Sequence, residues 1–275
     1  MLKKYFLTGG ETSQLSKEDL SQVRDLLLNS INFADDMNLL RRRGEVLTNV
    51  YSRLEQETSL LQQLESWSGN ENANARDFSL YLFQILADVH LSNDLIYQQS
   101  NNFMTIFSKS FKDSEVRVKV RALQATTAFL TSIDETDLVM KYSGLAGDLI
   151  DLLIVALQTD EDQGKQALSS LNDMANAHSE FLLPVRAKII DVVSQIIVTK
   201  TFEDSTRNSA MELVTTLVTE VPAIFRMEQK VGEFFVALTQ VLMELEDDDI
   251  EAWGSSTDEE DASGNTPSNA ARDAV

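Results

Sequence analysis

A cluster of carboxylates around one tryptophan near the end of the chain is the feature best suited to chemistry, and that chemistry is protein recognition. Residues 243–261 read MELEDDDIEAWGSSTDEED. Carboxylates pair with Lys and Arg of a partner, and an indole ring buries against apolar surface. A solvated charged tail is the alternative interpretation. The candidate partner-binding residues are Glu244, Glu246, Asp247, Asp248, Asp249, Glu251, Trp253, Glu259, Glu260 and Asp261.

No other set of residues indicates catalysis, a metal or a cofactor. The carboxylates at 247–249 lack the ligand spacing and the glycine of a calcium loop. His90 and His178 each lie near the end of a predicted helix, where a structural role suffices. The sequence contains no HExxH, Walker A, GxSxG or GxGxxG pattern. We therefore expect a protein that is not an enzyme and holds no metal or cofactor.

The charge of the chain favours basic partners. Its net charge is −21, and eleven acids against one base from Glu244 onward supply −10 of it. A field of this sign repels nucleic acid and anionic lipid. The absence of cysteine fits a reducing compartment. Because no apolar run is long enough for a membrane span or a secretory signal, we expect a soluble intracellular protein.

The elements that position these residues are predicted to be helices. Only three prolines and ten glycines interrupt 275 residues, which leaves long stretches without turn signals. Five helical segments share a small residue at spacings of 35, 43, 45 and 43, namely Gly44, Ser79, Ala122, Ala167 and Ala210. A small residue lets two helices approach closely. This repeat predicts stacked helical hairpins.

Two further features accompany the small residue. A basic residue lies three positions before it at Arg41, Arg76, Lys119 and Arg207, and Lys165 lies two positions before Ala167. An acid is expected to open four of these helices as an N-cap, at Asp36, Asp113, Asp160 and Asp204. We interpret both features as packing devices.

Partner helices fill the intervals between these segments. They are predicted at residues 17–32, 58–67, 94–109, 145–158, 181–200 and 221–245. Ser16 and Asp19 form a capping box, Pro184 lies near a helix start, and Pro222 separates two helices. A hairpin of about 40–47 residues is the HEAT or armadillo period. The predicted fold is an all-α HEAT-repeat solenoid of about six helix pairs over residues 1–246, with an acidic, largely disordered tail over 247–275.

Two other clusters have structural interpretations. The basic run at 41–43 lies inside a helix and includes the repeat's basic position, so we expect it to be structural. Eight apolar residues have helical spacing and are expected to be core, with grooves for a partner's aromatic side chains as the alternative. They are Phe78, Leu80, Leu82, Phe83, Phe103, Ile106, Phe107 and Phe111.

Residues 204–253 carry a family resemblance. The segment DSTRNSAMELVTTLVTEVPAIFRMEQKVGEFFVALTQVLMELEDDDIEAW resembles a nuclear import receptor of the importin-β superfamily, in the branch that carries ribosomal proteins and histones. The resemblance consists of a HEAT pair (205–221 and 223–245), a helix ending in MxLE, and an acidic loop that ends in Trp253. Residues 116–133 are similar to an earlier repeat of that branch.

The resemblance implies a function and partners. Such receptors bind the GTP-bound form of Ran through N-terminal repeats and an acidic loop, carry basic cargo on the inner face and meet Phe-Gly nucleoporins on the outer face. They shuttle between cytoplasm and nucleus through the pore. The residues from Glu244 to Asp261 named above would form the acidic loop. Family members are several times longer, so a generic HEAT scaffold and a truncated receptor without transport activity are the alternatives.

Overall fold

Every regular element that the structure describes is helical. The computed structural model describes residues 15–88, 91–222, 228–244, 267 and 271. Three sequence predictions lie outside these ranges: the role of His90, the partner-binding residues at 246–261, and the domain boundary at 246/247. Within them, all eleven predicted helices are present, together with a short helix, α8 (Thr136–Met140), that the sequence did not indicate. The all-α HEAT-type fold class is confirmed.

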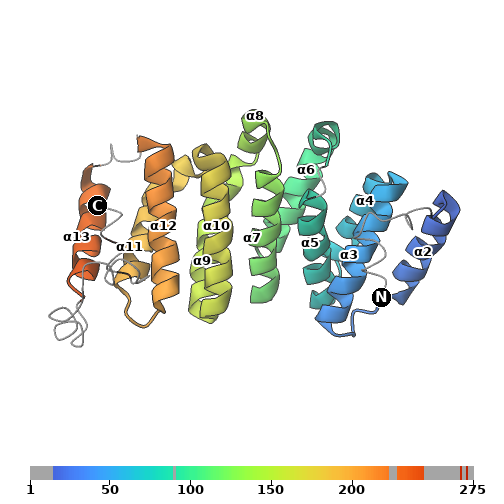
Figure 1. The fold of residues 1–275 in the computed structure, drawn as a ribbon, viewed down its shortest axis with the longest axis horizontal. Coiled ribbons are helices and arrows are strands. Elements are labelled where there is room, and N and C mark those ends of the chain that lie inside the picture. Colours follow the sequence, from blue (N-terminus) through green and yellow to red (C-terminus); the bar gives the residue numbers. More distant parts are fainter. Residues whose placement is uncertain (1–14, 89–90, 223–227, 245–266, 268–270, 272–275) are drawn as a thin grey trace, which may run out of the picture. The chain divides into compact units, whose positions relative to one another are not determined.

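The chain divides into two compact units, Met1–Leu138 and Val139–Val275. The first unit contains three hairpins, which pair α2 (Lys17–Ser30) with α3 (Met37–Leu54), α4 (Glu57–Ser68) with α5 (Ala73–Asp88), and α6 (Asn93–Ser110) with α7 (Val116–Thr131). The second helices form one row, because α5 contacts both α3 and α7, while α4 contacts α6 in the other row (Figure 1).

The second unit repeats this two-row arrangement. Its helices are α9 (Ala146–Thr159), α10 (Glu161–Leu182), α11 (Arg186–Val198), α12 (Asp204–Glu220) and α13 (Glu228–Leu242), with 3₁₀ turns at Ser143–Leu145 and Leu183–Val185. Helix α10 contacts α12 in one row, and α11 contacts both α9 and α13 in the other (Figure 1). In the described ranges, no helix is long and apolar enough to cross a membrane.

The predicted small residues let the helices pack closely. Gly44, Ser79, Ala122, Ala167 and Ala210 are all buried. A Cβ added to Gly44 would lie 2.3 Å from Leu82 Cδ2 and 2.8 Å from the Phe78 ring, so a larger residue would displace these side chains where α3 meets α5. The Ser79 hydroxyl donates to the Leu64 carbonyl at 2.7 Å and ties α5 to α4. The packing role predicted for this register is confirmed.

The aromatic stripes are core. All eight predicted residues are buried, which leaves none of them to line a surface groove. Phe83 of α5 makes edge-to-face contacts with Phe103 and Phe107 of α6 and with Phe129 of α7, at centroid distances of 5.1, 5.2 and 5.6 Å. One aromatic cluster therefore joins three helices of the first unit.

Two of the four predicted acidic N-caps are correct. Asp36 accepts from the Asn38 amide, and Asp160 accepts from the Asp162 and Gln163 amides. The capping box of Ser16 and Asp19 is also confirmed.

The predictions for Asp113 and Asp204 are wrong. Glu115 and Glu203 occupy the N-cap positions of α7 and α12. Asp113 lies two residues before the N-cap of α7, where its carboxylate accepts from Arg76 of the preceding hairpin and from the Glu115 amide. The predicted partner helix at 181–200 corresponds to α11, which begins at Arg186 because Pro184 falls in a 3₁₀ turn.

Two glycines of the second unit give a matched test of close packing. In α10, a Cβ on Gly164 would lie 2.3 Å from Leu157 Cδ2 and 3.1 Å from the Leu157 Cα, whereas a Cβ on Gly232 of α13 would have nothing within 4 Å. We expect Gly164→Ala to lower the free energy of unfolding by about 2 kcal/mol through overpacking. Gly232→Ala should raise it by up to about 1 kcal/mol through helix propensity. Urea unfolding followed by circular dichroism measures both, and equal stabilisation would refute the close approach.

Candidate protein-binding surface

Three of the repeat's five basic positions form hydrogen-bonded cross-links between successive hairpins. In each cross-link, an Arg or Lys of α5, α10 or α12 pairs with an acid that lies 37 or 38 residues later in the sequence. The three pairs are Arg76 with Asp113, Lys165 with Glu203, and Arg207 with Glu244. At these three positions, the basic residue forms an ion pair between repeats.

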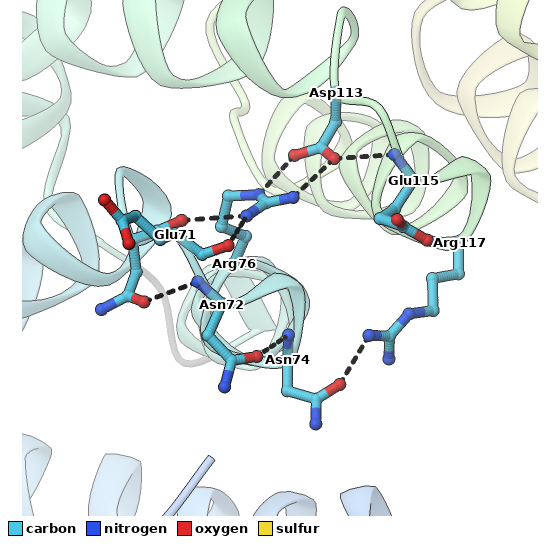
Figure 2. A network of polar contacts seen from close by, with 8 residues as sticks. Glu71, Asn72, Asn74, Arg76, Asp113, Glu115 and Arg117 are labelled. Carbon is cyan, nitrogen blue, oxygen red and sulfur yellow. Dashed lines mark hydrogen bonds and ion pairs between the residues drawn. The ribbon is translucent and has the colours of Figure 1, made fainter. Parts of the chain in front are cut away.

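Arg76 makes the most complete of these cross-links. Its Nε donates to Asp113 Oδ2 at 2.6 Å and its Nη2 donates to Asp113 Oδ1 at 2.9 Å. Its Nη1 donates to the carbonyls of Asn70 and Glu71, at 2.9 and 2.8 Å, so the guanidinium also fixes the loop before α5 (Figure 2). Only 15% of the Arg76 side chain and 7% of the Asp113 side chain are exposed.

The protonation of this pair follows from its contacts. Burial acts to raise the pKa of Asp113, but the hydrogen bonds from Arg76 and the Glu115 amide and the charge of Arg76 outweigh it. The pKa of Asp113 is therefore lowered below its usual value. The hydrogen bonds to Asp113 raise the pKa of Arg76 despite its burial. Both groups are charged over the physiological range.

A second polar contact joins the same hairpins beside this pair. Asn74, in the first turn of α5, receives a hydrogen bond from Arg117 of α7 on its side-chain oxygen at 2.5 Å (Figure 2). Its side-chain nitrogen donates to the Phe33 carbonyl at 2.8 Å. Polar side chains at the start of α5 therefore hold the loop before α3 and the start of α7.

A tyrosine between two arginines lies across α3, α5 and α7. The guanidiniums of Arg41 and Arg121 lie 5.4 and 5.5 Å from the ring centroid of Tyr81. The Tyr81 hydroxyl donates to Glu45 at 3.0 Å, and burial together with that carboxylate raises the pKa of Tyr81 to about 12. Buried Asp77 lies between the arginines, 3.7 Å from Arg41 and 3.5 Å from Arg121.

The run at 41–43 has the predicted structural role. Arg41 belongs to the tyrosine cluster, and Arg43 donates to Asp35 and to the Ser30 carbonyl, both at 2.7 Å. Arg42 is exposed.

In the second unit, α10 and α12 present exposed acids beside a polar contact. The Asn172 side-chain nitrogen donates to the Ser209 carbonyl and to Glu212, both at 3.1 Å. Asp173 and Glu212 are exposed. This row of helices therefore carries carboxylates that a basic segment can reach.

Of the ten predicted partner-binding residues, the structure describes one. Glu244 follows α13, and its carboxylate accepts from Arg207 Nη2 at 2.6 Å, with Lys200 Nζ at 3.8 Å. Arg207 is buried and also donates from Nε to the Ile197 carbonyl at 2.7 Å. Glu246, Trp253 and the other seven acids lie outside the described ranges. The sequence did not indicate the Arg207 pair, although the 37-residue separation shared with Arg76 and Asp113 is a signal that could have found it.

Paired rows of helices, cross-linked by ion pairs between repeats, define a structural class, the α-solenoid of HEAT type. Among the described residues, no group of three His, Asp or Glu side chains could hold a metal ion. Comparison with known proteins gives the family. A family model described as "IPO5-like, TPR repeats" matches residues 45–192, more than half of the chain. The chain therefore belongs to the importin-5-like family of the importin-β superfamily, whose members are transport receptors and not enzymes.

Individual relatives agree with this assignment. Importin subunit beta-3 of Saccharomyces cerevisiae is 23% identical over 267 residues, which cover 94% of this chain and 24% of the relative. A probable importin-5 homologue of Dictyostelium discoideum is 22% identical over 193 residues, covering 70% of this chain and 18% of the relative. The chain thus spans about a quarter or less of the length of these relatives.

The fold is that of Kap121p. A charge-reversed mutant of Kap121p matches 99% of this chain with a TM-score of 0.78 and 21% identity, over 26% of its own length. Kap121p bound to Nup53p matches with a TM-score of 0.76 and 22% identity, over 96% of this chain and 26% of that protein. Kap121p bound to RanGTP matches with a TM-score of 0.66 and 20% identity, over 95% and 27%.

Proposed function

We propose that this chain is a segment of a nuclear transport receptor that binds Ran-GTP, basic nuclear-localisation-signal cargo, or both. The observation that carries the proposal is the match of nearly the whole helix order to Kap121p, in a chain whose family is that of importin-5. Kap121p has been captured with RanGTP and with the SUMO protease Ulp1p. On this proposal the chain shuttles between cytoplasm and nucleus.

The charge of the chain supports a basic partner. A net charge of −21 steers a positively charged surface toward the helices and speeds encounter. Asp173 and Glu212 lie exposed on α10 and α12, where they can pair with Lys or Arg. The acidic residues from Glu246 to Asp261 extend this charge. We propose that they and Trp253 form the acidic docking loop.

We propose that Glu244 anchors the start of that loop. Its ion pair with buried Arg207 ties the chain after α13 to α12. Because Glu244 is already engaged within the chain, we assign it the anchoring of the loop rather than contact with a partner. We propose that the acids from Glu246 to Asp261 make the contacts with the partner.

A nucleoporin contact is part of the same proposal. Kap121p binds Nup53p, as its complex shows for that protein. In this chain, α13 exposes 39% of Phe235 and 60% of Val236. We propose that these apolar side chains take a Phe-Gly segment, because an aromatic ring gains most by burial against such surface.

Neutralising the loop should weaken binding of a basic partner. We expect replacement of Asp247, Asp248, Asp249 and Glu251 by Asn and Gln to reduce affinity by about tenfold, because each exposed ion pair contributes about 0.2–1 kcal/mol. The effect should shrink as salt rises, since the Debye length falls from about 30 Å at 0.01 M to about 10 Å at 0.1 M. The affinity of each variant can be measured against immobilised Ran, loaded with GTP or GDP, and against a basic import-signal peptide.

A matched control separates the loop from the overall charge. Replacement of four exposed acids elsewhere removes the same charge and should change affinity by less than about twofold. Those acids are Glu65, Glu71, Asp134 and Glu220. Unchanged binding in the loop variant would exclude the loop as the docking site. Equal binding of the two Ran forms, with salt-insensitive binding to other proteins, would favour a generic HEAT scaffold or a truncated receptor.

A further inference from the structure

A basic pocket opens in the first unit, in a chain that is otherwise strongly acidic. It lies where the C-terminal ends of α4 and α6 meet the loops that lead into α5 and α7, and its volume is about 470 Å³. Figure 2 shows one wall of it, with Arg76 and Asp113 side by side. The lining residues are Ser68, Gly69, Asn70, Arg76, Lys109, Ser110, Lys112, Asp113 and Ser114.

The lining carries two uncompensated positive charges. Arg76 and Asp113 neutralise each other in their two-hydrogen-bond ion pair. Lys109 and Lys112 are both exposed, and neither ammonium forms an ion pair with any residue in the described ranges. The two lysines are therefore free to pair with a ligand, inside a protein whose net charge is −21.

The rest of the lining suits a small anion. The hydroxyls of Ser110 and Ser114 donate no hydrogen bond to a described residue, so both can donate to a ligand oxygen. Gly69 leaves the Lys109 ammonium uncovered, because a Cβ there would lie 3.5 Å from Lys109 Nζ. The guanidinium of Arg76 is held by Asp113 and two carbonyls, which makes this wall rigid.

We propose that this pocket binds a phosphomonoester group, presented by a phosphorylated side chain of a partner protein. A phosphoserine carries a charge of about −1.5 to −2 at pH 7 and three acceptor oxygens, which match two ammonium groups and two hydroxyls. A carboxylate carries a single charge and matches less well. This inference does not depend on Ran or cargo binding, because it uses none of the residues proposed for the acidic docking loop.

Binding of a glycine-flanked phosphoserine peptide to the full chain tests the proposal. Calorimetric titration should show binding that weakens with salt, and the same peptide without phosphate should not bind. Inorganic phosphate and inositol hexakisphosphate distinguish the source of the group. Tighter binding of either than of the phosphopeptide would overturn the assignment to a partner protein in favour of a free phosphate compound.

Lysine variants locate the site. Replacing Lys109 and Lys112 by Gln should weaken phosphopeptide binding by about tenfold for each ammonium removed. Lys17→Gln with Lys200→Gln removes the same charge from two exposed lysines that are only loosely paired, at 3.8 Å, and should leave binding within about twofold. Equal losses in both double variants would overturn the proposal.

Gly69 provides a test that keeps both lysines. Its φ of −93° accepts any L-residue, so Gly69→Asp should fold and place a carboxylate beside Lys109. We expect Gly69→Asp to abolish phosphopeptide binding and the neutral Gly69→Asn to retain most of it. If Lys109 instead serves only to offset the C-terminal dipole of α6, the lysine variants will lower the melting temperature, the phosphopeptide will not bind the unmodified chain, and the proposal fails.

Discussion

Replacing Arg76 with Ala should lower the free energy of unfolding of the first unit by about 3 kcal/mol, a large loss for one side chain. The change leaves Asp113 charged, largely buried and without its two-hydrogen-bond partner. It also removes the donor to the carbonyls of Asn70 and Glu71. Arg42→Ala, at an exposed position of α3, should cost less than about 0.5 kcal/mol.

The loss of stability in Arg76→Ala should become smaller as pH falls. Since the folded pKa of Asp113 is lowered, its ion pair contributes fully above the unfolded pKa of about 3.9 and is lost as pH falls through the folded pKa. Without Arg76, burial raises the pKa of Asp113, so protonation relieves the variant as pH falls. The difference between the two proteins should therefore shrink in acid.

Trp67 reports on this unit directly. It is buried in α4 and makes an edge contact with Phe33 at 5.8 Å. In a Trp253→Phe background it is the one remaining tryptophan of the sequence, so urea unfolding followed by fluorescence isolates the first unit. Arg76→Lys keeps the charge but not the planar fork and should recover only part of the loss. A stability difference that stays constant from pH 7 to the acid range would contradict the role of the ion pair.

The repeat register could be predicted because it rests on residue size. A small residue is needed wherever a neighbouring helix packs closely, and this need recurs once in each repeat. It therefore leaves a regular spacing in the sequence, at Gly44, Ser79, Ala122, Ala167 and Ala210. The apolar stripes are predictable for the same reason, since their period follows from helix geometry. Eleven helices and the all-α fold class follow from these two patterns.

The partners of the basic positions could not be predicted in the same way. An acid before a helix fits two roles, an N-cap or an ion pair with another repeat, and the sequence does not separate them. Asp36 and Asp160 take the first role, whereas Asp113 takes the second. The choice depends on whether an Arg of the preceding hairpin reaches the carboxylate, which is a property of the stack.

For the candidate site too, the sequence predicts which residues are acidic but not which residues they pair with. Glu244 could be selected from the sequence as an acid, but its pairing with Arg207 changes its proposed role from partner contact to anchor. For the other nine residues the prediction still rests on composition and on the family resemblance. The basic pocket was not predicted, because the residues that line it are far apart in the sequence. Lys109 and Lys112 lie about 40 residues after Ser68 and Gly69, and the packing of α4 against α6 brings the two groups together.

Phe83→Ala should have an effect at least as large as Arg76→Ala, about 4 kcal/mol, because it empties the centre of the aromatic cluster. Phe83 contacts Phe103, Phe107 and Phe129 at once, so its loss leaves a cavity shared by α5, α6 and α7. Helices fixed on both sides have little freedom to collapse into that space. The cost should therefore lie toward the upper end for such a substitution.

Two variants separate the cavity from the loss of an aromatic ring. Phe83→Leu keeps most of the volume and should cost about 1–2 kcal/mol. Tyr97→Ala removes a ring that is 42% exposed in the same unit and should cost less than about 1 kcal/mol. Trp67 fluorescence in the Trp253→Phe background measures all three. If Phe83→Ala cost no more than Tyr97→Ala, the cluster would not be what joins the three helices, and the cross-links through Arg76 and Asn74 would have to carry the stability of this unit.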